Sequence, residues 1–169
     1  FGIAKALADD ETLRTGTGVG AMTPESASPE QVLGQPITVA TDVYALGALL
    51  YRLIAGRMPF ADADSPAALL GAICERDPVP PSRAAPVALV PRDVDLIVLK
   101  ALRKRPIERY DSAASLAADL GRYLSGRPIE AAPDTVAYRA RRFVARHRLA
   151  TAAVATGIVA LSGGVATTL

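Results

Sequence analysis

The carboxylate of Asp42 is the first side chain whose position suggests chemistry. It stands at the start of a long apolar stretch, and between Asp42 and Gly56 only Arg52 carries a charge. A carboxylate at the entrance of a buried segment is costly unless it accepts hydrogen bonds. Asp42 is therefore either the N-cap of a helix, or it also accepts hydrogen bonds from backbone N–H groups of a neighbouring loop. The motifs described below favour the second interpretation.

The glycine-rich stretch from Thr15 to Gly20 is a candidate phosphate-binding site, because its backbone N–H groups could bind a phosphate. A dinucleotide-binding or P-loop site needs an apolar strand before it and a helix directly after it, and neither pattern is present. We therefore interpret residues 1–27 as a loop. Phosphorylation of a loop hydroxyl adds nearly two negative charges and can order the loop against arginine side chains.

The apolar stretch itself predicts a central helix at about 42–55. Leucines and isoleucines follow one another so closely that no polar face remains, which is typical of a helix buried on all sides. Gly56 is a good stop signal and Pro59 prevents continuation. The remaining elements must pack around this helix and so position any functional side chain.

Three further helices are predicted at 65–76, 92–104 and 111–125. Ser65-Pro66 is a strong start signal for the first of them. The intervening residues 77–91 contain five prolines and are expected to form a connector without helix or central strand. No segment alternates between apolar and polar residues as a strand would, so the fold class is mainly α.

Four motifs in order carry a resemblance to a known family. The chain starts with Phe1-Gly2-Ile3-Ala4-Lys5, continues with Ser28-Pro29-Glu30 and Asp42-Val43-Tyr44-Ala45-Leu46-Gly47, and then reads Gly56-Arg57-Met58-Pro59-Phe60. This set resembles the C-terminal lobe of protein kinases, in particular bacterial membrane-anchored serine/threonine kinases, with Ser for Ala in the Ala-Pro-Glu motif. The resemblance covers residues 1–126. The start inside the Asp-Phe-Gly motif makes a fragment of a longer protein the expectation.

The resemblance implies roles for several loop residues. Phe1 and Gly2 would be the remnant of the metal-binding motif, and residues 1–30 would form the activation loop. Thr23 lies five residues before Ser28, where the family has a threonine that helps seat the substrate. Thr15 and Thr17 stand at a spacing similar to that of activation-loop phosphothreonines in bacterial kinases, so both are predicted phosphosites.

The resemblance also implies a structural pair between Glu30 and Arg109. Either residue could instead be a solvated surface charge. A buried carboxylate–guanidinium pair can be bidentate, and removal of one partner leaves the other charge stranded. Asp42, Glu30 and Arg109 are therefore expected to be architectural rather than catalytic.

Phosphoryl transfer requires a glycine-rich phosphate loop, a lysine, a catalytic aspartate with its asparagine, and metal-binding carboxylates. None is recognised in this chain, so we expect no ATP-binding or metal-binding residues here and an inactive fragment. The resemblance implies that the full-length protein is a kinase that uses ATP and Mg²⁺ on Ser or Thr of protein substrates, with a possible homodimer for autophosphorylation. The alternative is a membrane-bound pseudokinase scaffold.

The C-terminal part predicts contact with a membrane. Residues 127–148 are expected to be a short linker to 134 followed by a basic helix from about 135. Residues 149–169 contain no charge, and 21 residues at about 1.5 Å per residue match the thickness of a bilayer. The adjacent arginines favour a single-pass helix with the kinase lobe in the cytoplasm and lipid contacts along 135–169. A nucleic-acid-binding patch and a buried soluble helix are less favoured.

Composition sets the remaining limits. The chain has 169 residues, a formal net charge of +2 and no tryptophan, and half of its residues are hydrophobic. This is enough for one modest domain, with a core expected to depend on Leu, Val, Ile and Ala. The only cysteine, Cys74, excludes an internal disulfide and is interpreted as a small apolar helix residue.

Overall fold

The computed structural model describes residues 24–85 and 89–146. In these ranges the chain is helical and contains no strand, which confirms the mainly α fold class. The elements follow in the order η2 (Pro24–Ser26), α2 (Pro29–Val32), α3 (Val39–Ala55), α4 (Pro66–Glu75), α5 (Pro81–Ala84), α6 (Arg92–Ala101), η3 (Pro106–Glu108), α7 (Ala113–Leu124) and α8 (Val136–Arg146).

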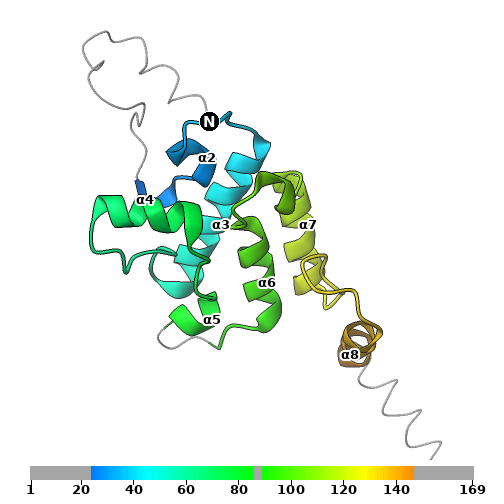
Figure 1. The fold of residues 1–169 in the computed structure, drawn as a ribbon. Helices are drawn as coiled ribbons and strands as arrows, with labels where there is room; N and C mark the ends of the chain where they lie inside the picture. Colours follow the sequence, from blue (N-terminus) through cyan, green and yellow to red (C-terminus); the bar gives the residue numbers. More distant parts are fainter. Residues whose placement is uncertain (1–23, 86–88, 147–169) are drawn as a thin grey trace, which may run out of the picture.

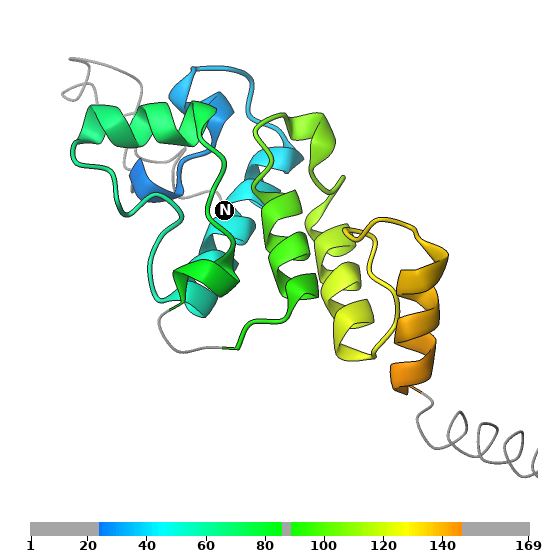
Figure 2. The same ribbon diagram turned by 60° about the horizontal axis from the view of Figure 1, so that its bottom comes forward.

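Helix α3 is the central element, as the sequence predicted. It contacts α5, α6, α7, η2 and η3, and α6 in turn contacts α7 (Figure 1). At Gly47 helices α3 and α6 approach so closely that a Cβ atom would lie 2.8 Å from Cβ of Ala101. Helices α4 and α8 lie at opposite ends of the molecule, as Figure 2 also shows.

Helix α3 begins at Val39 rather than at Asp42. The backbone N–H of Thr38 donates to Oγ1 of Thr41 at 3.2 Å, so the start of the helix is capped before Asp42 is reached. Asp42 lies within the first turn and is not the N-cap. The helix ends as predicted, with Gly56 in the left-handed conformation at φ 71°.

The predicted burial of α3 on all sides is wrong for one face. Leu46, Leu49 and Leu53 are 37%, 51% and 72% exposed. The described helices pack on the opposite face, where Tyr44 and Tyr51 are buried. Periodicity could not separate the two faces because both are apolar.

The core also differs from the composition-based expectation. The largest fully buried side chains are three tyrosines, Tyr44, Tyr51 and Tyr110. A buried tyrosine hydroxyl usually has a hydrogen-bond partner, and Tyr110 donates to Oδ2 of Asp119 at 2.8 Å. Aliphatic residues complete the two core clusters, which include Val43, Ala48, Ala55, Ile97, Val98, Ala101, Leu102, Leu116 and Ile129.

Two other helix predictions need correction. Proline-rich residues 77–91 contain the short helix α5, because Pro81 occupies its first turn, where proline is tolerated. Helix α6 ends at Ala101, before Lys104, whose ammonium group instead donates to the carbonyl oxygens of Ala72 and Ile73 at the end of α4. Ser65 is the N-cap of α4, as predicted, and α7 begins at Ala113 with Ser112 as its N-cap, close to the predicted start at 111.

Candidate functional site

Glu30 and Arg109 form a buried bidentate pair. Nη1 and Nη2 of Arg109 donate to Oε1 and Oε2 of Glu30, each at 2.8 Å. The arginine side chain is 0% exposed and the glutamate side chain 3%. The two residues are 79 positions apart, so the pair ties the segment around α2 to the segment around η3.

The capping of α2 and a hydrogen bond from α3 hold Glu30 in place. The side chain of Ser28 accepts from the N–H of Gln31, while the Gln31 side chain accepts from the N–H of Ser28 at 2.9 Å. This capping box fixes the first turn of α2. The hydroxyl of Thr41, on α3, donates to Oε1 of Glu30 at 2.8 Å. The carboxylate therefore connects α2 and α3 before Arg109 is considered.

Arg109 uses all its donors. Its guanidinium group also donates to the carbonyl oxygens of Ala40 at 2.7 Å, Arg103 at 2.7 Å and Lys104 at 3.0 Å. The group lies 4.9 Å from the centre of the Tyr44 ring. Because every donor has an acceptor, the charge is buried without an unsatisfied N–H.

The pKa of Glu30 reflects this environment. Burial alone raises the pKa, but the hydrogen bonds from Arg109, from backbone and from Thr41, together with the positive charge of Arg109, lower it to about 2. Glu30 therefore stays ionised at neutral pH. The pair is suited to holding structure and not to proton transfer.

Asp42 is exposed in the described chain. It lies on α3 at the end of the face that also exposes Leu46, Leu49 and Leu53. Its predicted role, accepting backbone hydrogen bonds from a neighbouring loop, has no partner among the residues that the structure describes and stays a prediction.

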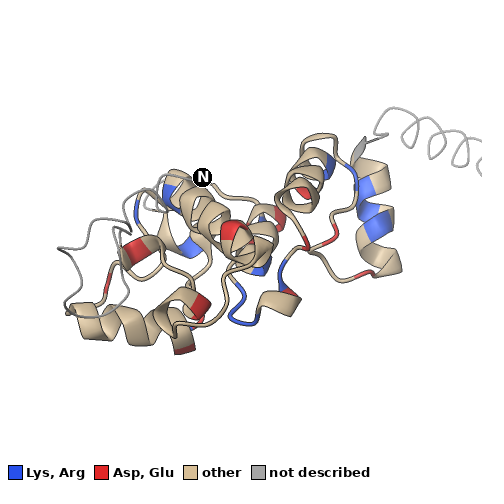
Figure 3. Ribbon diagram, turned by 90° about the horizontal axis from the view of Figure 1, so that it is seen from above, with Lys and Arg blue, Asp and Glu red and all other residues tan. Residues whose placement is uncertain are grey.

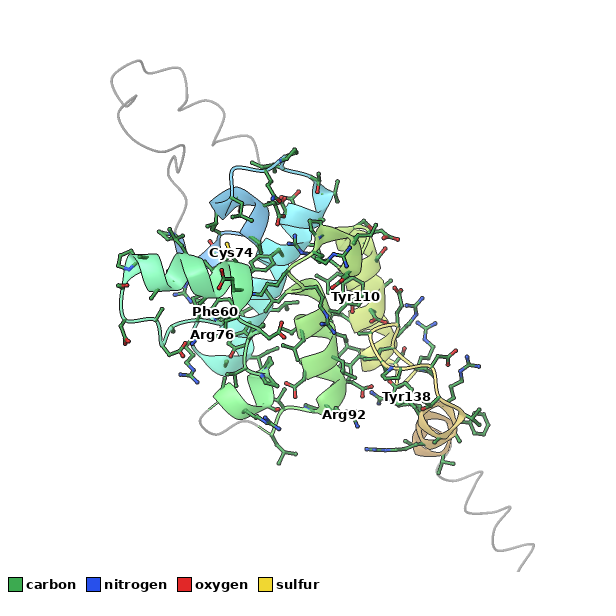
Figure 4. All side chains as sticks on the ribbon, in the orientation of Figure 1. Phe60, Cys74, Arg76, Arg92, Tyr110 and Tyr138 are labelled. Carbon is green, nitrogen blue, oxygen red and sulfur yellow. The ribbon has the colours of Figure 1, made fainter. Side chains whose placement is uncertain are left out.

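A groove of about 610 Å³ lies between the end of α3 and the start of α4. Phe60, which is labelled in Figure 4, forms part of its wall, and the lining includes both acidic and basic side chains. The lining also reaches Pro24 and Glu25, which directly follow Thr23 in the sequence. The complete lining is Pro24, Glu25, Arg52, Gly56, Arg57, Met58, Phe60, Ala61, Ala63, Asp64, Ser65, Pro66 and Leu69.

Asp119 is a structural residue that our sequence reasoning missed. It is 0% exposed and accepts from the backbone N–H groups of Glu130 at 2.6 Å and Ala131 at 3.0 Å. Burial raises its pKa, but these hydrogen bonds and that of Tyr110 lower it below the ordinary value. A signal was available, because Asp119 lies on the apolar face of its helix beside Leu116 and Leu120. The residues expected as a linker are thus packed against α7.

A second junction holds α8 against the rest of the molecule. The hydroxyl of Tyr138, which is labelled in Figure 4, donates to Oδ2 of Asp93 at 2.6 Å, and Arg142 pairs with the same oxygen. The N–H of Ile129 donates to the hydroxyl of Tyr138 at 3.3 Å. Helix α8 confirms the basic helix predicted in this region, and its docking through Asp93 at the start of α6 was not foreseen.

Several predicted residues lie outside the described part of the chain. These are Phe1, Gly2, Thr15, Thr17, Thr23 and the proposed transmembrane segment 149–169. Among the helices in residues 24–85 and 89–146, none combines the length and apolar character needed to cross a bilayer. The same ranges hold no cluster of three His, Cys, Asp or Glu side chains suited to a metal ion.

Comparison with known proteins gives the family. No family model matches the chain. The serine/threonine-protein kinase PknB of Mycolicibacterium smegmatis is 44% identical over 134 residues, which are 79% of this chain and 20% of that protein. PknB of Mycobacterium leprae is 43% identical over 131 residues (78% and 20%), and the probable serine/threonine-protein kinase CE0033 of Corynebacterium efficiens is 42% identical over 124 residues (71% and 18%).

This level of identity over most of the chain agrees with the motifs and with the buried Glu30–Arg109 pair. The chain belongs to the bacterial serine/threonine protein kinases. It spans about a fifth of the length of the curated relatives it matches.

Proposed function

We propose that this chain is part of a protein serine/threonine kinase that transfers the γ-phosphoryl group of ATP to Ser or Thr of protein substrates. The observation that carries the proposal is the Glu30–Arg109 pair, which joins two kinase-like motifs 79 residues apart. The names of the relatives support the same activity. This chain would contribute the activation loop, the substrate-side lobe and the membrane attachment.

ATP and Mg²⁺ would serve the full-length protein. The described residues do not offer a donor set for a metal ion, so we assign no step of the transfer to them. Their contribution is to hold the lobe rigid and to present the protein substrate. The groove between α3 and α4 supports the second role, because it reaches Pro24, the neighbour of Thr23.

The exposed face of α3 would be covered by the remaining part of the catalytic domain. Leu46, Leu49 and Leu53 form an apolar row with Asp42 at one end. An apolar row of this kind is costly to leave in water. Asp42 would then accept backbone hydrogen bonds from the loop packed beside it.

Thr15 and Thr17 would be phosphorylated in the activation loop, with Thr23 seating the substrate hydroxyl. One copy of the kinase would phosphorylate Thr15 and Thr17 of a second copy. Residues 149–169 would cross the cell membrane once, with the lobe in the cytoplasm, because the arginines precede the uncharged segment.

The test uses the full-length kinase that contains this chain. We expect it to phosphorylate protein substrates, and Thr23→Ala to lower kcat/KM by at least about tenfold with the KM for ATP unchanged. Thr12→Ala, in the same loop, is the matched control. Mass spectrometry should find phosphate on Thr15 and Thr17. A folded full-length protein without phosphoryl transfer would favour the pseudokinase scaffold instead.

A further inference from the structure

Helix α8 has two different faces. Tyr138 and Arg142 are one helical turn apart and point to Asp93. The other face carries the spacing i, i+4, i+7 and i+8 of an apolar stripe. We call its members Val136, Ala140, Phe143 and Val144 the α8 stripe. Val136, Phe143 and Val144 are 86%, 55% and 49% exposed.

Positive charge lies on both sides of the α8 stripe. Arg139 and Arg141 are exposed and flank it, and Arg139 also pairs with the exposed carboxylate of Asp134. Figure 3 shows basic residues along this helix. From Val136 to Leu169 the sequence contains no Asp or Glu. The stripe with its flanks is therefore apolar and cationic at once.

A shallow groove beside the stripe extends the apolar surface. It has a volume of about 470 Å³ and lies between α8 and the turn at Gly126 and Pro128. All members of the stripe line it. Arg127, within that turn, is also exposed. The apolar surface thus continues from α8 onto the lobe.

We infer that α8 lies on the surface of an anionic phospholipid bilayer, with its stripe inserted, while its other face stays docked on the lobe. A basic amphipathic helix binds anionic membranes through apolar burial and charge attraction. Nucleic acid would use the arginines but would leave the apolar stripe in water. The inference builds on the proposed membrane attachment of residues 149–169, which begin three positions after the end of α8.

The docking has a geometric consequence. A helix held by Asp93 on one side and by lipid on the other fixes the orientation of the lobe relative to the bilayer. Helix α4 and the groove beside it lie at the end of the molecule away from α8. The proposed substrate side would therefore face away from the membrane, where protein substrates can reach it.

The experiment uses tryptophan, which the chain lacks, as a single fluorescent reporter. The full chain carrying Phe143→Trp is reconstituted into vesicles of phosphatidylcholine and phosphatidylglycerol with or without brominated acyl chains. We expect bromine to quench the emission at least about twofold. Val136→Trp is a second reporter on the stripe, and Ile107→Trp, at a residue 83% exposed on η3, is the control that should not be quenched.

Vesicles of phosphatidylcholine alone should reduce quenching of both stripe reporters, and so should Arg139→Gln combined with Arg141→Gln. Flotation of the vesicles reports membrane attachment separately. A chain that floats with both stripe reporters no more quenched than the control would overturn this inference and leave the attachment intact. A chain that does not float, or that binds duplex DNA in preference to the vesicles, would overturn both.

Discussion

Two of the carboxylate–guanidinium pairs in the described residues join separate parts of the fold and differ in burial. Glu30 and Arg109 are 3% and 0% exposed at their side chains, and all five guanidinium hydrogen bonds are made inside the protein. Asp93 and Arg142 are 12% and 22% exposed and join α8 to the surface of the lobe. The same chemical pair therefore serves in one place as part of the core and in the other as a docking contact.

The difference shows that environment, not ion pairing alone, sets the energetic role of a pair. Removal of one partner from a buried pair strands a charge in a medium of low polarity. At a partly exposed pair, water can solvate the remaining charge, so the cost is small. Three predictions examine this comparison.

Replacement of Glu30 should have the largest effect. Glu30→Ala leaves Arg109 without its counter-charge and should lower the free energy of unfolding by roughly 3–5 kcal/mol. Chemical denaturation of the full chain in a non-ionic detergent measures this. Glu25→Ala, at an exposed carboxylate in the preceding turn, is the control and should change stability by less than about 0.5 kcal/mol. Equal, small effects of both variants would contradict a core role for the pair.

Acid should weaken the same junction. The pKa of Glu30 is about 2 in the folded chain and 4.5 as the ordinary value, so the unfolded chain binds more protons between these values. The stabilisation from Glu30 is complete above about pH 4.5 and is lost as the pH falls toward 2. Across this interval, the free energy of unfolding obtained from denaturation curves should therefore fall more steeply with decreasing pH in the wild type than in Glu30→Gln. Equal slopes in both proteins would show that Glu30 does not cause this pH dependence.

Replacement of Asp93 should have the smallest effect on global stability. Asp93→Ala removes the acceptor of Tyr138 and the partner of Arg142, and we expect a loss of about 1 kcal/mol or less. The change should be local: hydrogen exchange should accelerate in residues 136–146 and stay unchanged in α3. Asp134→Ala, which removes the exposed partner of Arg139, is the matched control and should leave that protection in place. Accelerated exchange in α3 as well would mean that the two junctions are not independent.

Much of the architecture could be predicted from the sequence because its signals are local. The capping serine at 65 and the stop at Gly56 each act within one helical turn, and the structure places the ends of these helices accordingly. The Glu30–Arg109 pair spans 79 residues and was predictable only because the ordered motifs resemble a kinase. The roles of Thr15, Thr17, Thr23 and Asp42 stay predictions.

Sequence alone determined the helical class, the apolar character of α3 and the amphipathic pattern of α8, since residue type and spacing specify these. Tertiary structure decided which face of α3 is covered, that Asp119 holds the backbone at Glu130 and Ala131, and that α8 docks on Asp93. These features depend on residues distant in the chain that meet only after folding. The sequence shows only where an Asp or Glu stands in the chain. The packed structure around the carboxylate sets its burial and its partners.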